Sequence, residues 1–512
     1  WIPASAGMTA RWIPASAGMT ARWIPASAGM TARWIPASAG MTPMIKEELK
    51  LNRELTGLEI AAREVIKKLR AKKHGAYFAG GYVRDIKLGL LPHDIDIATS
   101  AKPNQIEKLF KKTVPTGKAF GVIRVREKGH WFEVATFRID LPDGDARRPG
   151  GVKFTSAKED AKRRDFTVNA LFYDSTKEEI IDYVGGLEDL KKKELKFIGS
   201  AQKRINEDNL RLLRAVRFKT ALGFKMSKKD LDIIKKNKEK IQTVSAERIR
   251  EELTKMLVHP NRAKAMKELK KLGLLKEILP EIQKMVGVKQ PEKYHSEGDV
   301  WVHTLLALEH LPDNVSPEVA WAVLLHDVGK PPAQRTPEKH GVDRIRFSGH
   351  ENVSAKMAKE ITRRLKFSRK QVEKITWIVK NHMRLMHIQK MKKAKQRRLL
   401  QHPYFDDFMI VSYADIAASL QKGKPNFKDY DYAMKLLEEE EKRPKEEKKK
   451  KIISGHDIMK HFKIKSGPHI GKILEMVHDA YLEGKVGLDK KEILKFIKKN
   501  CYDFITKRKH NS

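Results

Sequence analysis

The chain has 512 residues and a formal net charge of +40, which falls only to +37 without the three arginines of residues 1–43. This length allows several domains with sizeable cores. Such a basic chain favours nucleic acid as a partner, although a basic solvated surface alone would give the same composition. Aromatic residues make up only 7% of the chain, which favours structured RNA bound through its backbone over stacked single strands.

The cysteine content and the hydropathy pattern bear on the compartment. Cys501 is the single cysteine of the sequence, which excludes an internal disulfide framework and indicates a reducing environment. The sequence has no apolar run of 18 residues, so no transmembrane helix is expected. We therefore expect a soluble, cytoplasmic protein without a membrane partner, and the sequence leaves its oligomeric state open.

Residues 1–43 consist of an 11-residue repeat, Trp-Ile-Pro-Ala-Ser-Ala-Gly-Met-Thr-Ala-Arg, present three times and followed by a partial fourth copy. Proline and glycine in every copy oppose a continuous helix. The segment also lacks the charged start and apolar core of a signal peptide. We interpret residues 1–43 as a repetitive, disordered or non-native extension with Met44 as the candidate start, and a functional tail is the alternative.

From Met44 onward, the first part of the chain has the pattern of a mixed sheet flanked by helices. Helical spacing with a basic face extends over 45–73. Strand-like segments follow at 76–78, 95–97, 122–126 and 131–137.

The most informative segment joins a Gly80-Gly81 pair to two acidic residues, Asp94 and Asp96. Residues i and i+2 of a strand project from the same face, so both carboxylates can bind one divalent cation while the isoleucine after each enters the core. Mg²⁺ prefers such carboxylates together with substrate phosphates, and two ions can activate a hydroxyl and stabilise leaving pyrophosphate. The glycines would let backbone N–H groups approach a triphosphate. The segment predicts a phosphoryl-transfer site; a solvated turn pair is the alternative for Asp-x-Asp alone.

Two further features follow these residues. Glu133 lies inside the last predicted strand, either as a third carboxylate near the metals or as a hydrogen-bonded strand residue. Residues 143–151 are rich in turn formers and basic side chains, which is typical of a mobile loop.

Farther along the chain, Asp208 and Arg211 are three residues apart and are expected on one helical face, with Leu210, Leu213 and Val216 toward the core. Arginine offers a planar fork of donors and aspartate offers acceptors, so the pair can contact the Watson–Crick edge of a base. A surface salt bridge between the two is the alternative.

The chain resembles the class II tRNA nucleotidyltransferases and bacterial poly(A) polymerases. The resemblance is carried by these residues and by the motifs at 159–170, 182–186, 207–218 and 245–251. The resemblance extends from about Met44 to the C-terminus. It implies that Asp94 and Asp96 hold Mg²⁺, with Glu133 as the candidate third catalytic carboxylate, and that 182–186 connects head and neck flexibly. The nucleotide-binding set that it implies is Gly80, Gly81, Arg84, Arg164, Asp165, Asn169, Asp208, Arg211, Arg214 and Arg217.

The implied activity is template-independent addition of C, C and A to the 3′ end of tRNA from CTP and ATP. The tRNA acceptor arm would be the partner, and Asp208 with Arg211 would select the base. In the family, a loop at 143–151 helps the switch from CTP to ATP, and its length here favours A addition. Residues 113–124 lack the arginine-rich element of poly(A) polymerases. An A-adding or CC-adding specialist and a poly(A) polymerase stay as alternatives.

A second group of residues looks like the metal ligands of an HD domain, above all a His-Asp pair before Val-Gly-Lys. The expected ligands are His303, His326, Asp327 and Asp415, with His350 and His382 completing a second metal position. Imidazoles and carboxylates suit Ni, Mn, Co, Fe or Zn, and a metal-bound water there could attack a phosphoester. A protein whose main activity is HD phosphohydrolase is therefore a rival interpretation, and a catalytically silent RNA-binding protein is another.

The resemblance implies an α+β fold: a polymerase-β-like nucleotidyltransferase head with a mixed sheet, followed by an all-α neck, HD body and tail. We expect the head at 44–195, a neck for nucleobase recognition and RNA binding at 196–260, and the body at 261–437. A linker and an RNA-binding tail would occupy 438–512. The charge run at 438–451 is expected to be an exposed helix end broken at Pro444.

Overall fold

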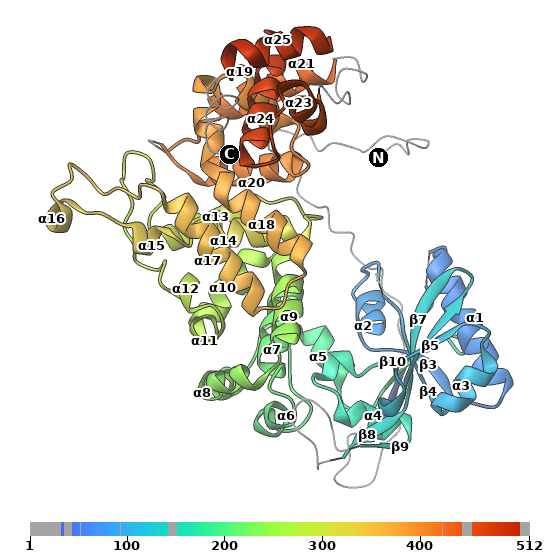
Figure 1. The fold of residues 1–512 in the computed structure, drawn as a ribbon. Coiled ribbons are helices and arrows are strands. Elements are labelled where there is room, and N and C mark those ends of the chain that lie inside the picture. The colour runs from blue at the N-terminus through green and yellow to red at the C-terminus, as the bar shows by residue number, and fades with distance from the viewer. Residues whose placement is uncertain are drawn as a thin grey trace. The chain divides into compact units, whose positions relative to one another are not determined.

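The computed structural model describes residues 32–34, 44–51, 53–92, 94–141, 151–421, 423–442 and 453–501. Most of the repeat region, the expected loop at 143–151 and most of the charge run at 438–451 lie outside these residues. The chain divides into two compact units, which Figure 1 shows as ribbons. Unit 1 comprises 1–138, 154–162 and 169–186, and unit 2 comprises 139–153, 163–168 and 187–512.

Unit 1 is built on a nine-stranded sheet of order β1-β2-β11-β10-β3-β4-β7-β6-β5. Its strands are β1 (Ala32–Trp34), β2 (Ile45–Glu48), β3 (Ala76–Ala79), β4 (Asp96–Thr99), β5 (Thr113–Gly117), β6 (Val122–Glu127), β7 (His130–Thr136), β10 (Phe172–Asp174) and β11 (Glu179–Asp182). Only β4 and β7 pair in parallel, and the other neighbours are antiparallel. The sheet is therefore mixed, as the sequence predicts. The short strands β8 (Arg138–Asp140) and β9 (Val152–Phe154) form a separate pair.

One face of the large sheet is buried by helices because its strands alternate apolar and polar residues. On β7, Phe132 and Val134 are buried while Trp131 and Glu133 are exposed. Helices α1 (Gly57–Ala71) and α3 (Pro103–Leu109) contact the sheet on the buried face (Figure 1). Helix α2 (Gly81–Lys87) connects β3 to β4, α4 (Ala157–Arg163) follows β9, and the 3₁₀ turns η1 (Lys118–Phe120) and η2 (Thr167–Asn169) complete the helical elements up to residue 169.

The predicted helix over 45–73 is wrong in its first part. Residues Ile45–Glu48 form strand β2, which pairs with β11 so that Ile45 lies opposite Asp182. The helix begins only at Gly57, because Thr56 and Glu59 form a capping box. Residues 45–48 have helical spacing, but pairing with the distant strand β11 makes them extended. The true start of the helix was signalled in the sequence by Thr56 and Glu59, the Thr-x-x-Glu pattern of a capping box.

Unit 2 is mainly helical, in agreement with the all-α neck, body and tail. Its first helices are α5 (Gly186–Lys192), α6 (Ala201–Glu207), α7 (Arg211–Leu222), α8 (Lys228–Lys236), η3 (Lys238–Thr243), α9 (Ala246–Val258), α10 (Arg262–Lys271), α11 (Leu274–Ile278) and α12 (Pro280–Gln283). The helices that follow are α13 (Val300–Glu309), α14 (Pro317–Leu325), α15 (Lys330–Ala333), α16 (Pro337–His340), α17 (His350–Arg364), α18 (Arg369–Asn381), η4 (His382–Lys390), α19 (Lys393–Leu400), α20 (Phe405–Ala418) and α21 (Lys428–Glu441). The last three are α23 (Gly455–Phe462), α24 (Pro468–Leu482) and α25 (Lys490–Asn500).

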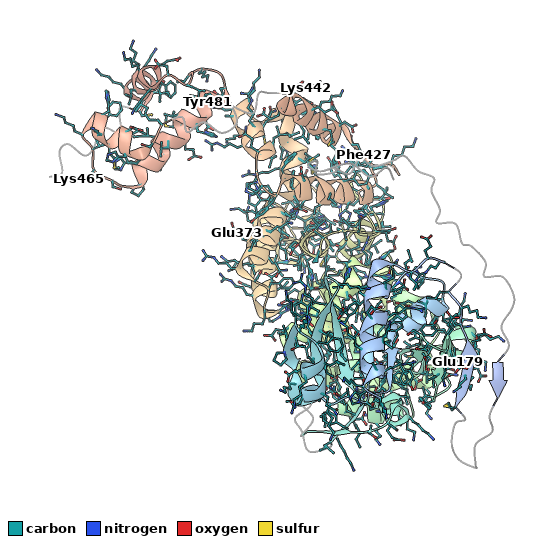
Figure 2. All side chains as sticks on the ribbon, turned by 90° about the vertical axis from the view of Figure 1, so that its right-hand side faces the viewer. Glu179, Glu373, Phe427, Lys442, Lys465 and Tyr481 are labelled. Carbon is teal, nitrogen blue, oxygen red and sulfur yellow. The ribbon has the colours of Figure 1, made fainter. Side chains whose placement is uncertain are left out.

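Separate apolar clusters hold the last helices together. Phe427 and Lys442 flank α21 (Figure 2), and Phe427 packs with Tyr413 against a core that includes Phe405 and Phe408. Helices α23 to α25 share another cluster, which contains the buried free thiol of Cys501. No helix in the described part of the chain has the length and hydropathy needed to span a bilayer.

The buried carboxylate of Glu59 should make the free energy of unfolding depend on pH. Burial raises the pKa of Glu59, but hydrogen bonds from Arg53, Thr56 and Tyr82 outweigh it and hold the pKa at about 2. Because this folded pKa lies below the unfolded value of about 4.3, the stabilisation is present at neutral pH and is lost as the pH falls from about 4.3 toward 2. We expect Glu59→Gln to lower the free energy of unfolding at pH 7 by roughly 2–3 kcal/mol, and less at pH 3.

Urea unfolding of both proteins at pH 7, 5, 4 and 3 measures this difference. Equal pH dependence of the two unfolding curves would contradict the assigned pKa of Glu59.

Candidate functional site

Three acidic side chains share the exposed face of the sheet in unit 1. Strand β4 begins at Asp96, and Asp94 lies two residues before it. Both are exposed, whereas Ile95 and Ile97 are 5% and 0% exposed, which is the alternation that the sequence predicts. On the parallel neighbour β7, Glu133 lies in register with Asp96. Residues in register project from the same face of a sheet, so the third candidate carboxylate stands beside the first two.

The donor set on this face fits a hard divalent cation. Neither Asp94 nor Glu133 forms an ion pair within the described residues. Three carboxylates are the kind of oxygen ligands that Mg²⁺ prefers. As a group of three, however, their ligand atoms do not come within 4.8 Å of one another; the groups in the described chain that do all lie in unit 2.

A glycine turn and a fixed arginine lie next to the acidic residues. Gly80 lies between β3 and α2 with φ 68° and ψ −125°, a conformation that favours glycine. A Cβ at Gly81 would meet only Arg84 Nη2, at 3.6 Å, so unit 1 itself does not require glycine there. Arg84 donates to Asn169 Oδ1 (2.6 Å) and to Asp85 Oδ1 (2.8 Å). Two predicted nucleotide-binding residues, Arg84 and Asn169, therefore contact each other directly.

In unit 2, a charged network joins Asp165, from the motif at 159–170, to the helices that follow. Arg214 on α7 donates to Asp165 Oδ2 (2.7 Å) and lies 3.5 Å from Glu252 Oε1. Arg217 donates to Glu252 Oε2 (2.6 Å). Burial lowers the pKa of Arg214, but the charges of Asp165 and Glu252 outweigh it and raise the pKa. The network therefore pairs the buried Asp165 with Arg214, next to the half-buried Arg164.

Asp208 and Arg211 do not form the salt bridge that was the alternative interpretation. Asp208 ends α6 and precedes α7, so the two are not on one helix. Arg248 binds Asp208 with both nitrogens (2.7 and 3.1 Å). Arg211 donates to Glu207 Oε2 (2.7 Å) and to two backbone carbonyls, those of Arg204 and residue 163. The predicted core residues Leu210, Leu213 and Val216 are buried.

Two residues of this region were missed at the level of sequence. Arg248 and Glu252 are four apart on α9, and neither was assigned a role from the sequence. Their i,i+4 spacing was a usable signal for one helical face. Their partners lie 35 to 40 residues away in the chain, so no local pattern could name them.

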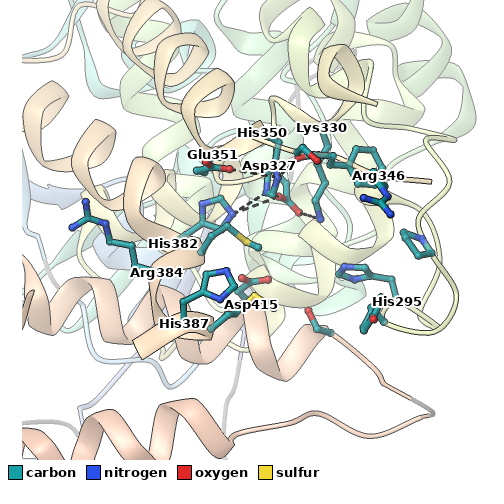
Figure 3. A pocket seen from close by; sticks show the side chains of 18 of the residues that line it. His295, Asp327, Lys330, Arg346, His350, Glu351, His382, Arg384, His387 and Asp415 are labelled. Atoms are coloured by element: carbon teal, nitrogen blue, oxygen red, sulfur yellow. Dashed lines mark hydrogen bonds and ion pairs between the residues drawn. The ribbon is translucent and has the colours of Figure 1, made fainter. Parts of the chain in front are cut away.

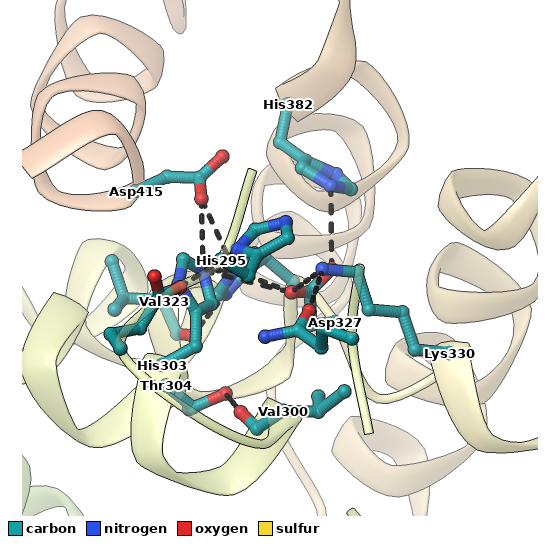
Figure 4. A network of polar contacts seen from close by, with 12 residues as sticks. His295, Val300, His303, Thr304, Val323, Asp327, Lys330, His382 and Asp415 are labelled. Atoms are coloured by element: carbon teal, nitrogen blue, oxygen red, sulfur yellow. Dashed lines mark hydrogen bonds and ion pairs between the residues drawn. The ribbon is translucent and has the colours of Figure 1, made fainter. Parts of the chain in front are cut away.

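The HD residues converge within unit 2 (Figure 4). His303 comes from α13, His326 and Asp327 follow α14, and Asp415 lies on α20. His303 Nε2 is 3.3 Å from His326 Nε2 and 3.0 Å from Asp415 Oδ1. The remaining two imidazoles, His350 and His382, have their Nε2 atoms 3.2 Å apart.

Asp327 lies between two groups of ligands. Its Oδ2 is 3.2 Å from His326 Nε2, and its Oδ1 is 3.3 Å from His350 Nε2 and 3.8 Å from His382 Nε2. The atoms of His303, His326 and Asp415 form one group within 4.8 Å, and those of Asp327, His350 and His382 form another. One carboxylate thus stands between two candidate metal positions, which fits a pair of metal ions.

Outer contacts fix the imidazoles so that each Nε2 faces the cluster. Nδ1 of His326, His350 and His382 lies 2.7–2.8 Å from a backbone carbonyl three residues earlier. Nδ1 of His303 instead contacts Glu297 at 3.0 Å. Such partners set the tautomer of a metal-binding histidine.

Burial and neighbouring charges shift the pKa values of two imidazoles in the cluster, those of His303 and His382. Burial lowers the pKa of His303, but hydrogen bonds with Asp415 and Glu297 outweigh it and raise the pKa to about 9. Burial and the nearby His326 lower the pKa of His382 to about 4. His382 is therefore neutral at pH 7, the form that binds a metal. Lys330 Nζ lies 2.6 Å from Asp327 Oδ2.

A cavity of about 870 Å³ opens onto this cluster (Figure 3). Asp327, His350, His382 and Asp415 line its inner part. Its other lining residues include the cationic side chains Lys330, Arg344, Arg346, Lys380 and Arg384. A cavity with metal-ligating groups inside and cations around them suits an anionic ligand of nucleotide size.

Three family models match the chain in succession. Residues 76–196 match a poly A polymerase head domain, 223–285 match a probable RNA and SrmB-binding site of polymerase A, and 295–419 match an HD domain. A CCA-adding enzyme of Streptococcus mutans is 29% identical over 439 residues, which cover 86% of this chain and 96% of that enzyme.

Other relatives match over part of their length. CCA-adding enzymes of Lactobacillus johnsonii, Ligilactobacillus salivarius and Latilactobacillus sakei are 42%, 43% and 37% identical, but the chain spans only 58%, 51% and 64% of their length. Among solved structures, the Bacillus stearothermophilus CCA-adding enzyme in complex with CTP aligns with a TM-score of 0.65 and 26% identity. That alignment covers 88% of this chain and 98% of that one. The chain therefore carries a poly A polymerase head domain, an RNA-binding region and an HD domain, and over most of its length it is similar to CCA-adding enzymes.

Proposed function

We propose that this protein adds C, C and A to the 3′ end of tRNA from CTP and ATP, without a nucleic-acid template. The observation that carries the proposal is the register of Asp96 with Glu133, which puts three carboxylates on one exposed face next to the Gly80 turn. The CTP complex of the Bacillus stearothermophilus enzyme and the Streptococcus mutans relative support it. Because its substrates would be tRNA and nucleoside triphosphates, we expect it to work in the cytoplasm.

In unit 1, Asp94, Asp96 and Glu133 would hold Mg²⁺. When bound, two such ions lower the barrier by polarising the attacking hydroxyl and the leaving pyrophosphate. Arg84, fixed by Asp85 and Asn169, keeps its guanidinium in a defined orientation for a phosphate. The protein's own contribution is therefore to fix charges before the substrate arrives.

In unit 2, Asp208 and Arg211 would choose the base. Both are oriented by partners that do not need the nucleotide: Arg248 for Asp208, and Glu207 with backbone carbonyls for Arg211. A preformed set of donors and acceptors discriminates bases better than a mobile one, because a mismatched base leaves polar groups unpaired.

A second candidate function is phosphohydrolysis at the HD cluster. The observation that favours it is the position of Asp327 between two imidazole groups, in a cavity with a cationic lining. Ni, Mn, Co, Fe or Zn would be held by these side chains and would supply an activated water. Lys330, Arg344 and Arg384 would bind the phosphoester oxygens.

The metal role of the head predicts that Asp94→Ala lowers nucleotide incorporation by about 1,000-fold or more, because the metals supply several kcal/mol of transition-state stabilisation. Affinity for tRNA should change less than about threefold, since a carboxylate does not attract a phosphate backbone. Assays with tRNAs ending before the tail, after one C and after two C, each with CTP or ATP, measure this and separate full CCA addition from partial addition. Glu48→Gln, an exposed carboxylate of the same unit, is the control. Retained incorporation by Asp94→Ala would refute the assignment.

The role of Arg248 predicts a loss of base choice. Arg248→Ala frees Asp208 to rotate, so we expect the preference for CTP and ATP over UTP and GTP to fall roughly tenfold, within the 1–3 kcal/mol that one good bidentate contact discriminates. Competition assays with mixed triphosphates measure this preference. Arg363→Ala, an exposed arginine of unit 2, should leave it unchanged. An unaltered preference in Arg248→Ala would mean that Asp208 is held by other groups or does not read the base.

The HD assignment predicts that Asp327→Asn reduces the amount of bound transition metal. Losing the carboxylate between both groups removes a ligand from each, so the metal content after dialysis should fall to less than half of the wild-type value. Elemental analysis measures it, and hydrolysis of a 2′,3′-cyclic phosphate measures the activity. Incorporation of CTP should persist in this variant and fail in Asp94→Ala. Asp313→Asn serves as the exposed control, and metal content equal to that of wild type would argue against the site.

A further inference from the structure

An exposed tryptophan stands on the same sheet face as the catalytic carboxylates. Trp131 is 40% exposed on β7, two residues before Glu133. The guanidinium carbons of Arg124 and Arg126 lie 5.3 and 6.0 Å from the centroid of the Trp131 ring. Both arginines come from the adjacent strand β6. A large apolar ring flanked by two cations and open to solvent is typical of a binding surface rather than of a core.

The strand register connects this group to the acidic residues. On β6, Arg126 lies opposite Trp131 and Arg124 lies opposite Glu133. Glu133 in turn lies opposite Asp96 on β4. Two residues of a strand span about 7 Å, so the ring stands roughly one side-chain row away from the carboxylates on a continuous exposed face.

The guanidiniums of Arg124 and Arg126 can donate hydrogen bonds to a ligand. In the described part of the chain, neither guanidinium forms an ion pair or a hydrogen bond. Each therefore offers its planar fork of donors, which matches the oxygens of a phosphate. The indole beside them is 40% exposed and offers a flat face to a nucleobase, and base stacking on an aromatic ring tolerates any base.

We propose that Trp131, Arg124 and Arg126 form an acceptor platform: the indole stacks on a nucleobase at the 3′ end of the RNA, and the two guanidiniums bind its phosphates. This inference rests on the proposed function and adds to it a site for the RNA end. The strand order separates the two substrates. Strand β3, which carries the Gly80 turn, lies on one side of β4, and β7 and β6 lie on the other. The acceptor end and the incoming triphosphate would thus approach the carboxylates from opposite sides.

Steady-state kinetics with a tRNA that lacks its terminal A tests the stacking role. For Trp131→Ala we expect the acceptor KM to rise about 10- to 100-fold, in line with the loss of one base–aromatic stack. The KM for ATP should stay within about twofold, and Trp131→Phe should restore most of the acceptor affinity because it keeps a flat ring. Ile60→Ala, an exposed apolar residue on α1 against the other face, is the matched control.

Salt dependence tests the phosphate role independently of catalysis. The slope of log K against log salt for tRNA binding, measured by fluorescence anisotropy, should decrease by about 0.7 for each of Arg124→Gln and Arg126→Gln. Lys67→Gln, an exposed cation on α1, should leave the slope unchanged.

The outcomes separate the two claims. An unchanged acceptor KM in Trp131→Ala, or a rise in the KM for ATP instead, would overturn the platform while leaving the proposed function intact. If the wild-type protein incorporated no nucleotide, the proposed function would fail, and the anisotropy slopes would still decide whether the arginines bind RNA.

Discussion

Carboxylates that repel one another can share one face of a sheet only if something other than their own interactions fixes their positions. Here the parallel pairing of β4 with β7 does so, because Ile97 and Val134 are opposite each other and fully buried. A slip of either strand by one residue would turn its acidic residue, Asp96 or Glu133, into the core and expose its apolar side chains. The cost of that exchange fixes the register, and the register fixes the acidic site and the row that contains Trp131.

The HD cluster also holds charged groups in fixed positions, but it does so by burial and hydrogen bonding. Asp327 is fully buried, and a buried carboxylate is stable only when cations or hydrogen bonds offset its lost hydration. Four imidazoles from separate segments and Lys330 surround it, and backbone carbonyls or Glu297 orient the imidazoles from outside. Both candidate sites therefore hold charged groups in fixed positions, one on an exposed sheet face and one beside a cavity.

Local patterns predicted the elements whose signals were periodic. The four strands expected in the head appear as β3, β4, β6 and β7, within one or two residues. Strand β2 was missed because its residues have helical spacing, and pairing with β1 and β11 makes them extended. Strand β5 was also missed, since Pro115 interrupts its pattern. The partner of Asp208 was beyond prediction, because Arg248 is 40 residues away.

The sequence by itself determined the residue types of both sites, the order of the domains and the mixed α+β class. The residue types depend on spacing along the chain, such as Asp-x-Asp on a strand or a His-Asp pair after an apolar helix, whereas the domain order and the fold class follow from the resemblance of the motifs to a known family. Only the tertiary structure decided which groups meet: Glu133 beside Asp96, Arg248 on Asp208, Asp327 between two imidazole groups, and two arginines over Trp131. These contacts follow from strand register and helix packing, which are set by burial of side chains distant in sequence.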